Sequence, residues 1–101
     1  MLKKFTVSKK RWARGEDRGC LYRRDRKMCC LGFFCRQIFN KKVDEIYGKP
    51  LPNSVGIGRD KLERQIEISM VNDDSLIPER GRIAKLQRIF KEAGYQMEVV
   101  E

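Results

Sequence analysis

The sequence of 101 residues contains no histidine, and this absence excludes more functions than any other feature of its composition. Without histidine the chain has no Ser–His or Cys–His dyad, no histidine general base and no mixed Cys/His zinc site. Most familiar classes of enzyme depend on one of these arrangements. We therefore expect a protein that is not an enzyme.

Long apolar runs are also missing. The longest candidate, residues 28–35, is much shorter than the ~20 apolar residues that a membrane-spanning helix needs. The first five residues, MLKKF, lack the apolar stretch of a secretory signal peptide. We therefore expect no association with a membrane and a cytoplasmic location.

Positive charge is abundant but unevenly distributed. The chain has 23 Lys and Arg residues against 14 Asp and Glu, a net charge of +9. Residues 1–50 hold 15 basic and 5 acidic side chains, a balance of +10, whereas residues 51–101 hold 8 and 9, a balance of −1. Such an asymmetry steers acidic proteins, nucleic acids or phosphorylated small molecules toward the N-terminal half. A basic face that is merely solvated is the alternative.

The apolar pattern predicts one small α+β domain that comprises residues 1–101. Strands are predicted at 2–7, 20–23 and 95–99, in a short antiparallel sheet of about three strands with helices packed on one side. Helices are predicted at 9–14, 32–40, 43–47, 60–71 and 78–93. In the fourth of these, Leu62, Ile66 and Met70 share the apolar face.

The segment 49–54 is the best candidate for a linker, because it contains two of the three prolines. It separates the basic N-terminal half, 1–50, from the near-neutral and mostly helical C-terminal half, 51–101. Each half is small for independent folding, so we expect a single domain.

The four cysteines, Cys20, Cys29, Cys30 and Cys35, allow several interpretations. Nothing marks the chain for export, which disfavours disulfides. Zinc sites use short C-x2–4-C spacings, whereas the adjacent Cys29 and Cys30 point in different directions. Packing in the core is favoured over zinc, and no metal or cofactor is predicted. A nucleophilic Cys20, with its pKa lowered by nearby cations, is a third possibility that lacks a general base.

Two short segments combine cations with an aromatic side chain, at 9–14 (KKRWAR) and 22–27 (YRRDRK). Cations neutralise phosphates, and exposed aromatic rings stack on bases. If the first segment is helical and the second a turn, both open on one edge of the sheet. In the alternative interpretation, Trp12 anchors a short helix in the core and the cations point into water. The candidate residues for binding an anionic partner are Lys9, Lys10, Arg11, Trp12, Arg14, Arg23, Arg24, Arg26 and Lys27.

Two groups of residues together resemble a recurrent type of small phage- and prophage-encoded protein. The first group is WARGE at 12–16 with KMCCLGF at 27–33, and the second is Asn72-Asp73 followed by Glu79-Arg80. The matched positions are few, although they span most of the chain, and no activity is assigned to this type. The resemblance implies an accessory protein in the cytoplasm of a bacterial host, where it binds a host component in counter-defence or host takeover.

Charge and resemblance together predict a non-enzymatic protein whose basic N-terminal face binds an acidic host component. Direct binding of nucleic acid is the first alternative, although the signatures of the RRM, KH and Cys/His-finger folds are missing. Sequestration of a small anionic nucleotide is the second alternative.

Overall fold

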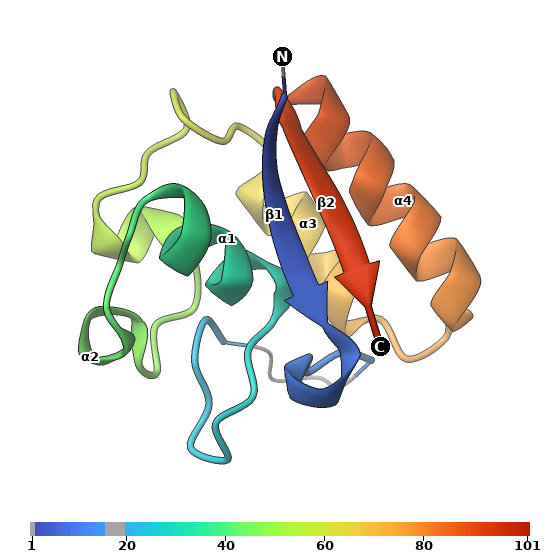
Figure 1. Cartoon of the computed structure of the whole chain (residues 1–101), viewed down its shortest axis with the longest axis horizontal. Helices are drawn as coiled ribbons and strands as arrows, with labels where there is room; N and C mark the ends of the chain where they lie inside the picture. The colour runs from blue at the N-terminus through green and yellow to red at the C-terminus, as the bar shows by residue number, and fades with distance from the viewer. Residues whose placement is uncertain (1, 16–19) are drawn as a thin grey trace.

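The computed structural model describes residues 2–15 and 20–101, and these form helices around a short sheet (Figure 1). The predicted α+β class is confirmed. The elements in chain order are strand β1 (Lys3–Ser8), the 3₁₀ helix η1 (Lys9–Arg11), helices α1 (Cys30–Ile38) and α2 (Val43–Ile46), the 3₁₀ helix η2 (Pro52–Val55), helices α3 (Gln65–Asp73) and α4 (Glu79–Glu92), and strand β2 (Tyr95–Val100).

The sheet differs from the prediction, because it has two strands and they run parallel. Strand β1 pairs with β2 in a register that runs from Lys3 opposite Tyr95 to Ser8 opposite Val100. The predicted strand at 20–23 is wrong, since Tyr22 forms only an isolated bridge to Tyr47. Alternating apolar residues reveal a half-buried strand but carry no information on the direction of its partner.

One face of the sheet is buried. Phe5 and Val7 of β1 and Tyr95 and Met97 of β2 point into the core, and α1 and α4 pack against these strands (Figure 1). The ring of Phe34 in α1 lies 5.5 Å from that of Phe5 and 4.8 Å from that of Tyr95, measured between centroids. Both contacts are edge-to-face, a favourable geometry for aromatic pairs. The core therefore unites the two halves of the chain.

Helix α1 packs unusually close to the segment that precedes it. It begins at Cys30, two residues before the predicted start. A Cβ atom at Gly32 would lie only 1.9 Å from the carbonyl oxygen of Leu21 and 2.9 Å from the Cβ of Met28. A glycine at this position is therefore a steric requirement of the fold.

Helix α3 presents a different face to the core from the one predicted. The helix begins at Gln65 instead of residue 60, and it buries Gln65, Ile68, Val71 and Asn72. Ile66 and Met70, expected in the core, are 65% and 68% exposed. The prediction failed because two amide side chains occupy the buried face, where hydrogen bonds make their burial favourable.

Gln65 also explains why the predicted linker is part of the folded domain. Its Nε2 donates hydrogen bonds to the carbonyls of Ile57 and Leu62 at 2.8 and 3.0 Å. Its Oε1 accepts a bond from the backbone N–H of Asn53 at 2.9 Å, and the neighbouring Pro52 is buried. The segment that contains the prolines at 50 and 52 is thus bonded to the start of α3, and Pro52 begins the 3₁₀ helix η2.

The last helix and strand agree with the prediction. Helix α4 ends at Glu92, and Gly94 has φ of +96°, the left-handed conformation in which a glycine terminates a helix. The amide of Gly94 donates to the carbonyl of Lys91 at 3.0 Å. This turn leads the chain directly into β2.

Candidate anion-binding surface

The two basic segments lie together at one end of the molecule, the end toward which both strands point (Figure 1). Helix η1 directly follows β1. The segment after it forms a parallel bridge between Trp12 and Met28. The amide of Met28 donates to the carbonyl of Arg11, and the amide of Ala13 donates to the carbonyl of Met28, both at 2.8 Å. This register places Arg11 beside Lys27.

Residues 23–27 form a tight turn that carries four cations. The amide of Arg23 donates to the carbonyl of Lys27 at 2.7 Å, and that of Arg26 to the carbonyl of Arg23 at 3.0 Å. Arg26 has φ of +69°, in the left-handed region. The carboxylate of Asp25 accepts a bond from the backbone of Lys27 at 3.1 Å. Backbone bonds thus hold the turn, and Arg24, Arg26 and Lys27 are exposed on it.

Six of the nine candidate residues are exposed cations, and we call this group the basic end. Within residues 2–15 and 20–101, the only carboxylate within 4.0 Å of any of them is Glu101, which lies 3.8 Å from Lys10. Both of these side chains are largely in solvent, so the pair is weak. The basic end consists of Lys9, Lys10, Arg11, Arg24, Arg26 and Lys27.

Trp12 belongs to the core, as the alternative interpretation has it. It is 2% exposed, and its Nε1 donates to the Oδ1 of Asn72 at 2.7 Å. A ring in this position is not available to stack on a ligand.

Arg14 and Arg23 are occupied by carboxylates. The guanidinium of Arg14 binds both carboxylate oxygens of Glu79, with a shortest distance of 2.5 Å, and lies 4.7 Å above the ring of Trp12. Hydrogen bonds from Arg14 lower the pKa of Glu79. Arg23 lies 3.0 Å from Asp25. These two arginines stabilise the fold beneath and beside the basic end.

Asn72 connects the segments beneath the basic end. Besides the bond from Trp12, its Oδ1 accepts one at 3.1 Å from the amide of Cys30, which is the first residue of α1. Its Nδ2 donates to the carbonyl of Ala13 at 2.9 Å, and its own carbonyl accepts from Gly15 at 2.8 Å. Residues from three separate segments of the chain therefore meet in one hydrogen-bond network.

Three of the four cysteines are buried, which supports packing in the core. Burial raises the pKa of Cys29 and of Cys35 to about 12 and also raises that of Cys30. Partial burial raises the pKa of Cys20 as well and outweighs the lowering effects of its bond to the Tyr22 carbonyl and of Arg23. This direction is opposite to the one that a nucleophilic Cys20 needs. In the part of the chain that is described, no group of three or more Cys, Asp or Glu side chains could hold a metal ion.

A pair of tyrosines lies next to the basic end. The bridge between Tyr22 and Tyr47 brings their rings to a centroid distance of 6.3 Å with an interplanar angle of 36°. Tyr47 is 50% exposed. The amide of Leu21 donates to the carbonyl of Lys49 at 2.9 Å, which keeps this exposed lysine beside the pair. Sequence reasoning missed the pair because its members are 25 residues apart and only the fold joins them.

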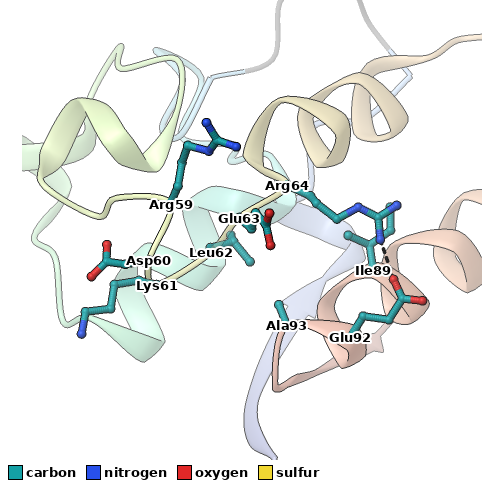
Figure 2. A pocket seen from close by; sticks show the side chains of 9 residues that line it. All are labelled: Arg59, Asp60, Lys61, Leu62, Glu63, Arg64, Ile89, Glu92 and Ala93. Atoms are coloured by element: carbon teal, nitrogen blue, oxygen red, sulfur yellow. Dashed lines mark hydrogen bonds and ion pairs between the residues drawn. The ribbon is translucent and has the colours of Figure 1, made fainter.

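A pocket of about 380 Å³ lies between residues 59–64 and the end of α4 (Figure 2). The guanidinium of Arg64 points to the carboxylate of Glu92 at 2.5 Å and also binds Glu67 at 2.7 Å (Figure 2). The pocket is lined by three cationic and three anionic side chains, so their charges cancel. This balance gives no support to a pocket for an anionic nucleotide. The charged lining residues are Arg59, Asp60, Lys61, Glu63, Arg64 and Glu92.

The comparisons with protein-family models, with curated proteins and with solved structures gave no match to this chain. Over the described residues, the structure contains no helix with both the length and the apolar character needed to cross a bilayer. The surface chemistry of the chain itself is therefore the basis for a functional proposal.

Proposed function

We propose that this protein is a binding protein without catalytic activity, and that its basic end docks on an acidic macromolecule. If the chain is of the phage type that it resembles, this partner is a component of the bacterial host. An acidic host protein and a nucleic acid both offer the required chemistry.

One observation carries the proposal, namely that the six cations of the basic end are exposed while nearby cations are neutralised. Arg14 is held by Glu79, and Arg23 is held by Asp25. An arginine that has no carboxylate partner keeps its full set of donors for phosphate or carboxylate oxygens. The cations lie on two backbone-anchored segments, so binding does not require the fold to rearrange.

The electrostatic field supports the same surface. The N-terminal half has a balance of +10 and the C-terminal half a balance of −1. A negatively charged partner is therefore steered toward the basic end, and its association rate falls as salt is added.

The proposal is tested with a matched pair of charge reversals. The first variant, Arg24→Glu with Arg26→Glu, changes the basic end, and the second, Arg88→Glu with Lys91→Glu, makes the same change of net charge on exposed positions of α4. Binding to single-stranded DNA, duplex DNA and polyglutamate is measured by fluorescence anisotropy at low and high salt.

We expect the first variant to weaken polyanion binding at least tenfold and the second to weaken it much less. Equal effects of the two variants would show that only net charge matters, which contradicts a defined site. Failure of all three polyanions to bind the unmodified protein at low salt would refute the proposal.

A further inference from the structure

We infer that the tyrosine pair, Tyr22 and Tyr47, together with the basic end forms a site for single-stranded nucleic acid. The pair supplies surfaces on which unpaired bases stack, and the cations hold the phosphates. This inference rests on the proposed function and names the class of its partner.

The tyrosine pair is exposed to solvent. Half of the surface of Tyr47 faces solvent, and Tyr22 is partly exposed. The rings are tilted at 36° and their centroids are 6.3 Å apart, near the upper limit for aromatic contact. The two rings therefore touch without covering each other, which leaves ring surface open to a ligand.

Two cations flank the tyrosine pair. Arg24 follows Tyr22 by two positions in the chain, and Lys49 follows Tyr47 by two positions on the other side of the bridge. Both cations are exposed and have no ion pair within the described residues. Binding sites for single strands combine two components, namely exposed aromatic rings and flanking cations.

Open aromatic surface favours a single strand over the other acidic partners. In a duplex the bases are already paired and stacked on one another, so they present only edges in the grooves. An acidic protein offers carboxylates, which the cations can bind without help from the tyrosines. A site with open aromatic surface therefore gains affinity specifically from unpaired bases.

The backbone holds the pair in place independently of the hydroxyl groups. The amide of Gly48 donates to the carbonyl of Tyr22 at 3.0 Å, and the amide of Tyr47 donates to the carbonyl of Val43 at 2.9 Å. Within residues 2–15 and 20–101 no hydrogen bond to either phenol oxygen is found at the pair. A phenylalanine at position 47 should thus keep both the fold and the stacking surface.

The inference is tested with Tyr47→Leu and Tyr47→Phe in the full chain. Affinities are measured for a labelled single strand of mixed DNA sequence, for the duplex that contains it, and for polyglutamate. Base stacking on an aromatic side chain contributes about 1–3 kcal/mol, so we expect Tyr47→Leu to weaken single-strand binding about 5- to 150-fold. Tyr47→Phe should retain it within about twofold, and the affinity for the duplex should change little in both variants. Circular dichroism and thermal unfolding verify that the variants fold.

The outcomes distinguish this inference from the proposed function. Unchanged single-strand affinity in Tyr47→Leu would overturn the inference, and the proposed function would stand if reversal of Arg24 and Arg26 still weakens binding at least tenfold. Binding of polyglutamate without any binding of DNA would likewise overturn the inference and leave an acidic protein as the partner. Failure of the unmodified protein to bind any of the three probes at low salt would overturn both the inference and the proposed function.

Discussion

Replacing Asn72 by alanine gives a direct test of the network that supports the basic end. The Asn72 side chain is fully buried, and it serves three buried partners in other segments. Its Oδ1 accepts from the indole of Trp12 and from the amide of Cys30, and its Nδ2 donates to the carbonyl of Ala13. Alanine removes all three bonds at once and leaves the partners buried.

The magnitude follows from the cost of unpaired buried groups. Each such group costs about 1–3 kcal/mol, and the three costs are not additive because they share one cavity. We therefore expect Asn72→Ala to lower the free energy of unfolding by about 3–5 kcal/mol. Domains of this size have only about 5–15 kcal/mol in total, so the variant should be marginally folded at best.

Urea unfolding measures this loss, because Trp12 is the only tryptophan and reports directly on the network. Asn53→Ala is the matched control, since Asn53 is exposed and bonds to Gln65 and Gly56 through its backbone groups. Circular dichroism provides a second probe of the same transition. A loss below about 1 kcal/mol, or equal losses in Asn72→Ala and Asn53→Ala, would refute the account of Asn72.

Three further predictions concern other parts of the fold. Gly32→Ala should destabilise the protein by at least about 3 kcal/mol, because the new Cβ would meet the carbonyl of Leu21. Gly81→Ala in α4 is the control, and it should stabilise the protein by roughly 0.5–1 kcal/mol because the nearest atom, in Ile77, is 3.7 Å away. Similar urea midpoints for the two variants would contradict the close packing of α1. The pKa of Glu79 lies below its usual value of 4.5, so its stabilising effect is complete above pH 4.5 and is lost as the pH falls through its lowered pKa in the folded state. Urea midpoints of Glu79→Gln should accordingly decline less between neutral and acidic pH than those of the unmodified protein, and parallel declines would argue against the bond with Arg14. In a thiol titration at neutral pH, Cys29, Cys30 and Cys35 should react only after denaturation, while Cys20 should react sooner; four fast native thiols would exclude the buried arrangement.

The elements that the sequence predicts well are those with local signals. Helix α4 has an apolar stripe, a proline before its first residue and Gly94 after its end, and all three lie within one segment. The apolar alternation that predicts strands β1 and β2 is likewise contained within each strand. The direction of their pairing depends on the path of all the intervening residues, which local alternation does not encode.

The orientation of α3 shows a second limit. Periodicity favoured Ile66 and Met70 for the core, but Gln65 and Asn72 are buried instead. Their amides satisfy backbone and indole groups that are close only in the folded chain. A hydropathy pattern counts such amides as polar and assigns them to the surface, so it misjudges a helix whose buried face is held by hydrogen bonds.

The candidate site shows the same difference between features that follow from local sequence and features that only the fold produces. The excess of positive charge in the N-terminal half follows from counting, and the position of the basic end follows from two short segments. The sequence does not show which arginines are held by carboxylates, because Arg14 meets Glu79 across 65 positions of sequence. The pairing of Tyr22 with Tyr47 is likewise a product of the fold.

The most direct test of the central claim is the salt dependence of binding to single-stranded DNA. Each phosphate contact contributes about −0.7 to the slope of log affinity against log salt, so six engaged cations predict a slope of about −4. The double change Arg24→Ala with Arg26→Ala should reduce its magnitude by about 1.4, whereas Arg88→Ala with Lys91→Ala should leave it unchanged. A slope near zero, or equal slopes in the unmodified protein and the first variant, would contradict binding through the basic end.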